Sequence, residues 1–546
     1  MLTGLKKNYL LLLLIIIAFL WLFISFESGT IPFGLDNASN YFFPLDIFTR
    51  ITEGEAFIYS GLIYTAPFFH LFRLVGITPE LLSWGYFFFC LISGVTGIYM
   101  LTAINSRRHH EGIAGFVSGL YLLSTLFSVW IFNQPNFLFL AAYASIPWII
   151  FYIQYISLGE RMGVLRYSHL FFISLIFMTT TLNVVAFSLY CMQIGLIALC
   201  LGHSSGIKFR NSLKTLTLWL VIITAAFLIP MQTLLWMNSK TLIHHEFMDY
   251  LTDMRSNRIV SEVTEDLRES EIKHNDIINV VRFAAGWTEL HDTSGDRIFT
   301  NTQIYERTSF KILGMIPFLF AILLLPNKIM REKLLLFALL CIGIIINTRY
   351  FLTLTENNYI LANALRWPTS KLWPLVILPI GLLFGSSVAI AHEGLEKRKL
   401  FANILLILTP FILIIYAYPI IMKGPVSPQV KVSLPPEYYS LKSLGHDHTI
   451  LVLPQPQKIY FREFDWGYYG DDFISYITNA KVIDDSNLYF KPGEYENQLK
   501  KLVSCKLDVD YVLINHEPTK AAVFDCPYTE KFTYRHYTLF KLTDKR

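Results

Sequence analysis

The chain has 546 residues, of which 53% are hydrophobic and only 16% are charged, and its mean hydropathy is +0.45. Soluble globular proteins carry roughly 25% charged residues, so this composition excludes a cytosolic enzyme, a disordered chain and a coiled coil. The net charge of +4 is too small to indicate a nucleic-acid-binding protein. The composition therefore predicts a multi-pass membrane protein.

Apolar stretches of about 20 residues predict membrane-spanning helices. We expect about eleven, at 8–26, 81–104, 112–132, 137–157, 168–182, 185–202, 213–236, 309–325, 333–349, 372–391 and 400–421. Lys and Arg in the short loops gather on the side of the N-terminus, which the positive-inside rule assigns to the cytoplasm. An odd number of spans in the cytoplasmic membrane then leaves the C-terminus outside the cell. The first span follows Lys6 and Lys7 and lacks a small-x-small cleavage site, so we expect a retained signal anchor.

Two outer loops are expected between the spans, at 27–80 and 238–308. The first contains Asp36 and Asp46 on either side of an aromatic patch. Carboxylates among aromatic side chains at a membrane surface tend to hold protons more tightly, which favours a general base for an incoming hydroxyl group. The alternative is a pair of solvated loop carboxylates. In the second loop, His244-His245-Glu246 resembles a metal-binding cluster, but we interpret it as polar surface.

A break is expected within the apolar stretch 168–202, which is too long for one span. We place it at Thr181–Asn183, in the segment TTTLNVVAF. A discontinuous helix is tolerated in a bilayer only where it lines a cavity or is buried in protein. Asn183 could donate hydrogen bonds to a polar ligand there, or it could make a structural bond between helices.

Two cations precede the tenth span in the segment LANALRWPTSKLWPL, residues 361–375. Pro368 disfavours a regular helix between Arg366 and Lys371, so a turn could bring both side chains to one point. Cations at the lipid boundary are costly unless they are paired. Phosphate is a natural partner, because Arg binds it with two hydrogen bonds and Lys as a point charge. The alternative is that both side chains extend to lipid headgroups.

The polar C-terminal part, 424–546, is expected to form a small extracytoplasmic α/β domain after the transmembrane domain 1–423. Strand-like runs at 449–454, 480–484, 510–516 and 537–542 alternate with a helix-like segment at 492–505. Cys505 and Cys526 lie in this part, and an oxidising compartment would allow a disulfide between them. The other four cysteines lie in apolar runs and are expected to be inert core residues.

These features together resemble the GT-C class of membrane glycosyltransferases, which use polyprenyl-phosphate-linked sugars. The likeness is to the transmembrane part of the arabinofuranosyltransferases of mycobacterial cell-wall arabinan synthesis. It is carried, in chain order, by Asp36, the segment YTAPFFHLFRLVGITPELLSWGY, Pro147-Trp148, the break at Thr181–Asn183, Arg366 with Lys371, and the C-terminal FREFDWGYYGDDF and VDYVLINH.

The resemblance implies an inverting transfer of one sugar from a polyprenyl-phosphate donor to a glycan or glycolipid outside the cell. Asp36 would be the catalytic base, Arg366 and Lys371 would bind the donor phosphate, and Asp46 and Asn183 would position the substrate. No cofactor is assigned with certainty; a divalent metal stays open, although the first loop lacks the Asp-x-Asp motif that would favour one. Two alternatives stay open: a transporter or flippase for lipid-linked sugars, and a non-catalytic membrane scaffold for glycan assembly.

Overall fold

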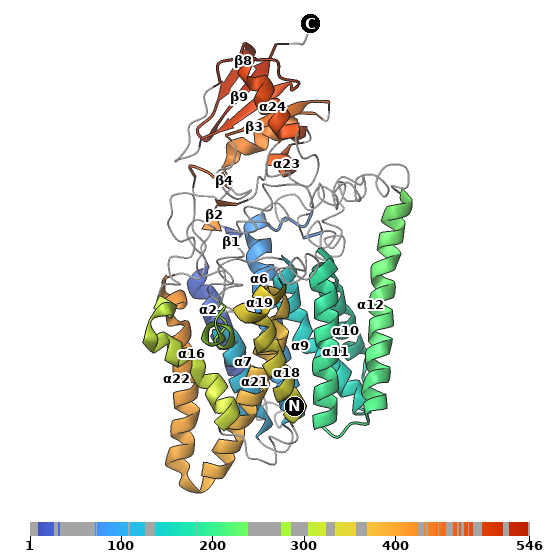
Figure 1. Ribbon diagram of the computed structural model, residues 1–546, viewed down its shortest axis with the longest axis vertical. Helices are drawn as coiled ribbons and strands as arrows, with labels where there is room; N and C mark the ends of the chain where they lie inside the picture. Colours follow the sequence, from blue (N-terminus) through green and yellow to red (C-terminus); the bar gives the residue numbers. More distant parts are fainter. Residues whose placement is uncertain are drawn as a thin grey trace.

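The chain forms a bundle of apolar helices with a small sheet domain at one end (Figure 1). This computed structural model describes residues 9–26, 31–32, 71–72, 74–106, 110–125, 137–182, 184–237, 275–284, 304–323, 333–355, 368–423, 431–432, 435–445, 447–454, 462–466, 469–470, 474–478, 480–483, 494–516 and 524–543. The helices of the bundle are α2 (Tyr9–Ser25), α6 (Pro79–Asn105), α7 (Glu111–Ser124), α9 (Phe137–Ser157), α10 (Val164–Met178), α11 (Val184–Ser204), α12 (Phe209–Met237), α15 (Ile277–Val281), α16 (Thr308–Leu323), α18 (Leu334–Asn347), α19 (Arg349–Thr355), α21 (Pro368–Leu395) and α22 (Lys399–Lys423).

Every predicted apolar stretch coincides with a helix, but the predicted count of eleven spans is not confirmed. Within the described residues, four helical stretches are long and apolar enough to cross a membrane, and a fifth qualifies if α18 and α19, bent by 63°, form one span. Four further apolar helices, α2, α7, α10 and α16, are shorter. One qualifying stretch, Thr369–Pro419, has 51 residues. It contains both α21 and α22, because the chain turns at the 3-10 segment η5 (Glu396–Arg398) and the two helices pack together (Figure 1).

Small residues allow α7 and α21 to approach each other closely. A Cβ atom on Gly385 would overlap the Ser118 hydroxyl and the Ala114 carbonyl oxygen. One turn earlier, the Ser118 hydroxyl donates a hydrogen bond of 2.7 Å to the Gly381 carbonyl. Glycines four residues apart form a groove that accepts a neighbouring helix, a common device between membrane helices.

The predicted break in the 168–202 stretch is present. Helix α10 ends at Met178, a 3-10 turn η2 (Thr179–Leu182) follows, and α11 begins at Val184. The Thr180 hydroxyl donates a hydrogen bond of 2.7 Å to the Phe177 carbonyl. Such side-chain bonds to the preceding turn compete with the regular helical ladder, which explains why a run of threonines ends the helix here.

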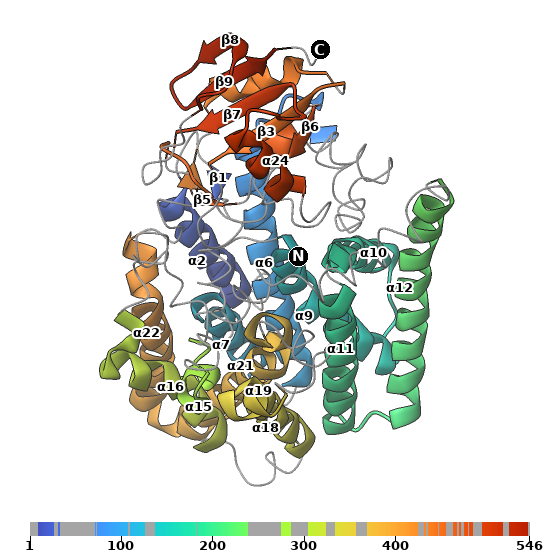
Figure 2. The ribbon, with the colours of Figure 1, turned by 45° about the horizontal axis from the view of Figure 1, so that its top comes forward.

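The C-terminal sheet has five strands in the order β6 (Lys481–Ile483), β3 (Thr449–Leu453), β7 (Tyr511–Asn515), β9 (Tyr537–Leu542) and β8 (Tyr528–Thr533). Strands β6, β3 and β7 run parallel to one another. Strand β9 runs antiparallel to β7, and β8 runs antiparallel to β9. Helix α24 (Glu494–Val503) covers one face through Leu499 and Leu502 (Figure 2). The short elements are β4 (Arg462–Glu463), β5 (Tyr469–Gly470), α23 (Ile474–Ile477) and the 3-10 helix η6 (Pro436–Ser443). The predicted strands and helix are all present, and β8 is an additional strand.

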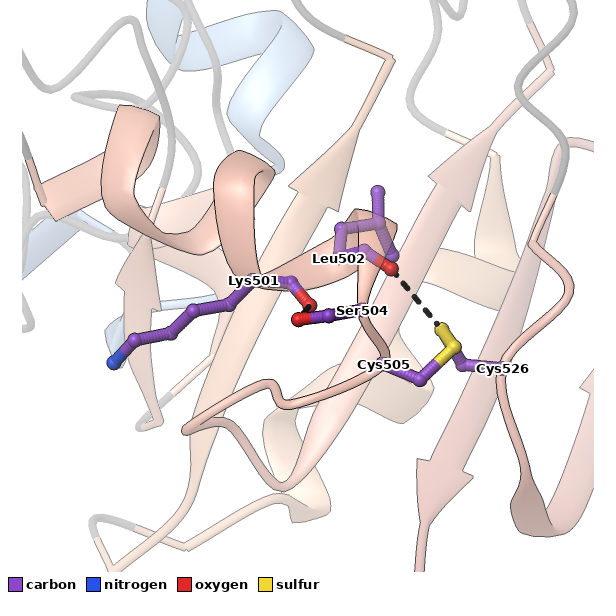
Figure 3. The surroundings of a disulfide bond; sticks show 5 residues. All are labelled: Lys501, Leu502, Ser504, Cys505 and Cys526. Atoms are coloured by element: carbon purple, nitrogen blue, oxygen red, sulfur yellow. Dashed lines mark hydrogen bonds between the residues drawn. A yellow bond between two sulfur atoms is a disulfide. The ribbon is translucent and has the colours of Figure 1, made fainter.

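A disulfide joins Cys505 to Cys526, with Cα atoms 5.3 Å apart (Figure 3). It ties the end of α24 to the segment that leads into β8. The Cys526 sulfur also lies 3.4 Å from the Leu502 carbonyl oxygen. Cys90, Cys191, Cys200 and Cys341 are free and lie in the helices of the bundle.

The bundle and the sheet domain are linked by a short strand pair. Strand β1 (Ile31–Pro32), from the first predicted outer loop, pairs antiparallel with β2 (Lys431–Val432), from the segment that precedes the sheet domain. Strand β1 also packs against α6. The first loop and the start of the C-terminal part therefore meet at the same end of the bundle. The domain boundary that we predict at residue 424 stays a prediction.

Candidate functional site

The first turn of α21 contains the predicted site residue that the structure describes, Lys371. Lys371 is buried, with 6% of its surface exposed. This turn packs against α11. The role of Lys371 in binding a donor phosphate stays a prediction.

Two side chains of α11 fix the first turn of α21. The Tyr190 hydroxyl donates a hydrogen bond of 2.8 Å to the Ser370 carbonyl, and the Gln193 amide donates one of 2.7 Å to the Lys371 carbonyl. The Ser370 carbonyl would ordinarily bond the amide four residues later, but that residue is Pro374, which has no N–H group. Tyr190 supplies the missing donor, so the position of Lys371 depends directly on α11.

The electrostatic environment of this turn favours an anion. The N-terminus of a helix carries about half a unit of positive charge, which disfavours a cation in the first turn and attracts a negative group. Lys371 adds a full positive charge at that end of α21, a helix of 28 residues. Unbonded backbone N–H groups at a helix N-terminus are a common phosphate-binding element. Two elements that bind phosphate in proteins, a lysine and a helix N-terminus, are therefore present at this turn.

Buried polar atoms in the same region have no hydrogen-bond partner among the described residues. They are Thr179 Oγ1 in η2, Gln193 Oε1 in α11 and Thr369 Oγ1 beside Ser370. Buried polar groups are nearly always satisfied, so atoms of this kind mark a place where a polar ligand or water completes the bonding. Gln193 and Thr369 belong to the contacting pair α11 and α21, whereas Thr179 lies in η2, which contacts α9, α10 and α11.

The other predicted site residues lie outside the described residues. These are Asp36 and Asp46 in the first outer loop, Asn183 in the break, and Arg366 before α21. The structure brings Lys371 to α11, the helix that follows the break, but it does not test whether Asp36 and Arg366 share a crevice with it. Their roles stay predictions.

Arg282 is a second buried cation, which the sequence analysis did not identify. It follows α15, and only 4% of its surface is exposed. Its Nε and one terminal nitrogen donate to the Asn279 side-chain oxygen at 3.0 and 2.6 Å, and its other terminal nitrogen donates to the Tyr305 carbonyl. Tyr416 of α22 donates to the Arg282 carbonyl at 3.2 Å. These partners are all neutral, so the charge of Arg282 is stabilised by oriented dipoles.

A small pocket borders Arg282, between α7, α16 and α22. Its wall includes Tyr121, Ser124, Thr125 and Tyr416. The Ser124 hydroxyl is buried and has no partner within the described part of the chain. The only sequence signal for this site was an arginine in the largely apolar run IINVVRFAAGW, after a charged segment. We regard it as a secondary anion-attracting position at the same end of the bundle.

Within the described residues, one group of side chains has the spacing of a metal site. His110, His392 and Glu396 lie at the opposite end of α21 from Lys371, with ligand atoms all within 4.8 Å of one another. The group is remote from the first turn of α21, and we return to it below.

Two solved structures, both single-particle cryo-EM classes of a mutant of arabinofuranosyltransferase AftD from Mycobacteria, have a fold similar to that of this chain. One matches with a TM-score of 0.57 and 15% identity, over 98% of this chain and 42% of the AftD chain. The other matches with a TM-score of 0.54 and 14% identity, over 97% of this chain and 41% of the AftD chain. No family model matches the sequence, and no curated protein sequence matches it.

The chain therefore spans about two fifths of the length of these AftD structures. The likeness to arabinofuranosyltransferases expected from the sequence is confirmed at the level of the fold. Together with the apolar helices, it identifies the chain as a membrane protein whose fold is similar to that of these AftD structures. At this level of identity the comparison does not extend to the activity.

Proposed function

We propose that the protein is an inverting glycosyltransferase that moves one sugar from a polyprenyl-phosphate donor to a glycan or glycolipid acceptor on the outer face of the cytoplasmic membrane. The observation that carries the proposal is that Lys371 is buried in the first turn of α21, whose backbone carbonyls are bonded by α11. The fold shared with AftD supports it. The topology proposed with it has the N-terminus in the cytoplasm and the sheet domain outside.

In the proposed reaction, an acceptor hydroxyl oxygen attacks the anomeric carbon of the donor sugar from the face opposite the phosphate. Asp36 takes the hydroxyl proton, and the bond between the anomeric carbon and the phosphate oxygen breaks. The electron pair of that bond leaves with the polyprenyl phosphate, which gains one negative charge. Because phosphate is a good leaving group, no general acid is needed.

Lys371 and Arg366 would stabilise the leaving phosphate. A cation aimed at the position where charge develops is worth more in a water-excluded site than in water, and it needs no reorganisation during the reaction. The positive end of α21 acts in the same direction. Asp46 and Asn183 would orient the sugar or the acceptor beside the unsatisfied hydroxyl groups of Thr179 and Thr369.

The disulfide between Cys505 and Cys526 supports the proposed location of the sheet domain. Disulfides persist in oxidising compartments and are rare in the cytosol. A sheet domain that carries a disulfide is therefore expected outside the cytoplasm, where lipid-linked sugars would be used to build a glycan.

The test is transfer by purified full-length protein from a panel of radiolabelled polyprenyl-phosphate sugars to membrane glycans. We expect Lys371→Met to lower kcat/KM for the donor by at least about 100-fold, the usual effect of removing one transition-state charge partner. Asp36→Asn should abolish transfer while donor binding is kept. The matched control is Lys333→Met, since Lys333 also contacts α21, through Ser386, but at the other end.

Each outcome separates the proposal from its alternatives. Donor turnover in wild type with none in Asp36→Asn supports the enzyme. Movement of labelled lipid across vesicles without any sugar transfer would identify a flippase. Equal activity of Lys371→Met and Lys333→Met would refute the assignment of the donor phosphate to the first turn of α21.

A further inference from the structure

A cluster of two histidines and one glutamate lies at the end of the bundle opposite the sheet domain. His110 immediately precedes α7, His392 is in the last turn of α21, and Glu396 begins η5. His110 Nε2 lies 2.9 Å from Glu396 Oε1, and the two imidazole rings are 5.2 Å apart at an angle of 84°. His392 and Lys371 are 21 residues apart on one helix, so the cluster lies about 30 Å from the proposed donor site.

We propose that His110, His392 and Glu396 form a binding site for a divalent transition-metal ion, with Zn²⁺ as the preferred ion. Two imidazoles and one carboxylate are a common three-ligand set for zinc, with water in the fourth position. This proposal is independent of the proposed glycosyltransferase activity.

The local backbone arranges these ligands. His392 and Glu396 are four residues apart, a spacing that places two side chains on the same side of a helix. His110 has φ of 30° and makes no side-chain capping bond, so its ring is not used by the start of α7. The chain turn between α6 and α7 and the turn between α21 and α22 thus converge on one point.

The distances agree with coordination after small side-chain rotations. Zinc bonds of about 2.0–2.2 Å in tetrahedral geometry separate neighbouring ligand atoms by roughly 3.3–3.6 Å. The ligand atoms of the cluster already lie within 4.8 Å of one another, and they are on side chains with rotatable bonds. The His392 Nδ1 atom is buried and has no hydrogen-bond partner in the described part of the chain, so it is not engaged by a competing bond.

The donor atoms decide which class of ion fits. The exposed neighbours carry both signs of charge, with Glu111 and Glu393 beside the two histidines and Lys397, Arg398 and Lys399 beyond Glu396. Two of the three donors are imidazole nitrogens, which disfavours Ca²⁺ and Mg²⁺ because these ions bind through several oxygen ligands. Ions that form strong bonds to neutral imidazole nitrogen, among which Zn²⁺ is the most available in proteins, are favoured instead.

A bound ion would link the α6–α7 turn to the α21–α22 turn. The α6–α7 turn and the α21–α22 turn are linked now by the ion pair between His110 and Glu396, whose side chains are 35% and 54% exposed. Such exposed pairs contribute little to stability, whereas a metal that binds only the folded state stabilises it in proportion to its affinity. Zinc should therefore raise the thermal unfolding midpoint of the protein.

The test uses full-length protein purified in detergent with an affinity tag that contains no histidine. After treatment with EDTA and dialysis, Zn²⁺ is added and the bound metal is counted by equilibrium dialysis with mass spectrometry. We expect about one Zn²⁺ per chain, and a tetrahedral Co²⁺ spectrum when cobalt replaces zinc. The double variant His392→Ala/Glu396→Gln should bind at least about 100-fold more weakly, beyond the 10- to 100-fold effect typical of outer-shell changes.

Two further variants keep the test decisive. His110→Gln removes the ligand outside α21 and should weaken binding without disturbing that helix. His203→Ala is the matched control, because His203 is exposed in the last turn of α11, which ends beside α6 through the bond from Ser205 to Asn105. If wild-type protein retains no Zn²⁺, or if all variants bind it equally, the proposal is wrong whatever the result of the transfer assay.

Discussion

The helical bundle and the sheet domain satisfy their buried polar groups in different ways. In the bundle, the buried Arg282 has no carboxylate partner among the described residues. It donates hydrogen bonds to neutral oxygens of Asn279 and Tyr305. In the sheet domain, the His536 ring lies between two carboxylates, 2.8 Å from Asp465 and 3.6 Å from Glu437. The comparison shows that a buried cation of the bundle is bonded by neutral oxygens, whereas a buried imidazole of the sheet domain is bracketed by carboxylates.

The two regions also differ in what holds them together. Close helix contacts at glycines and single bonds from side chains to carbonyls stabilise the bundle. A strand ladder and a disulfide stabilise the sheet domain. Changes to one set of contacts should therefore leave the other region nearly unaffected.

The largest loss of stability is expected from Gly385→Leu, at the contact between α7 and α21. The new side chain would collide with Ser118 and with the backbone of Ala114, and overpacking that moves backbone should cost more than about 3 kcal/mol. We expect little monodisperse protein in size-exclusion chromatography. Gly85→Leu is the control, since nothing lies within 4 Å of a Cβ there. Equal yields of the two variants would mean that α7 and α21 are not closely packed.

The next largest loss of stability is expected from removing the disulfide between Cys505 and Cys526. Opening a loop with a sequence separation of 21 residues should destabilise the sheet domain by about 3 kcal/mol. Cys505→Ser should therefore speed proteolysis within residues 435–543 while the bundle stays intact, and reductant should bring wild type to the same rate. Cys200→Ser, which removes a free thiol in α11, is the control. A wild-type rate that does not respond to reductant would contradict the prediction.

A smaller effect is expected from Tyr190→Phe in α11. It removes the hydroxyl that bonds the Ser370 carbonyl, which Pro374 leaves without a helical donor. An unsatisfied buried carbonyl costs about 1–3 kcal/mol, so the unfolding midpoint of the bundle should fall. The KM for the donor should also rise if α21 presents Lys371 to a phosphate. Tyr167→Phe, at an exposed position in α10, should change neither value.

The sequence predicted most of the fold, because the relevant signals are local. Apolar stretches of helical length, the threonine-rich break and the alternating strands β3, β6, β7 and β9 all have local patterns. Strand β8 was missed because its segment YTEKFT is mostly polar and fully exposed, and it lacks the continuous apolar run that marks β3 and β7. The disulfide partners could be named because only two cysteines lie in the polar C-terminal part.

The candidate sites were harder to predict, because they depend on contacts between distant segments. Arg282 is held by Asn279, Tyr305 and Tyr416, which are up to 134 residues away along the chain. His110 and Glu396 come from two turns that only the folded bundle brings together. Lys371 was named because it lies near Arg366, with Pro368 between them, before the tenth predicted span, but its burial follows from the tertiary packing of α21.

The smallest effect is a pH dependence confined to the sheet domain, which arises from Tyr537 in β9. This side chain is fully buried, and its hydroxyl donates to the Glu437 carbonyl at 3.1 Å and lies 2.9 Å from the Ser440 hydroxyl. Burial raises the pKa of the Tyr537 phenol above its ordinary value near 10. A raised pKa in the folded state means that the stabilisation is complete below about pH 10 and is lost as the pH rises above that value.

Tyr537→Phe tests this sign directly. The variant lacks the hydrogen bonds and should be less stable than wild type at pH 8, by about 1 kcal/mol. Because it has no phenol to ionise at this position, its loss of stability between pH 9 and pH 11 should be less steep, and the gap between the two proteins should close. Denaturant unfolding followed by sheet-domain proteolysis measures both curves, with Tyr528→Phe on the exposed strand as the control. A gap that widens with pH would mean that the ionised phenol is stabilised in the fold, which would reverse the role assigned to its burial.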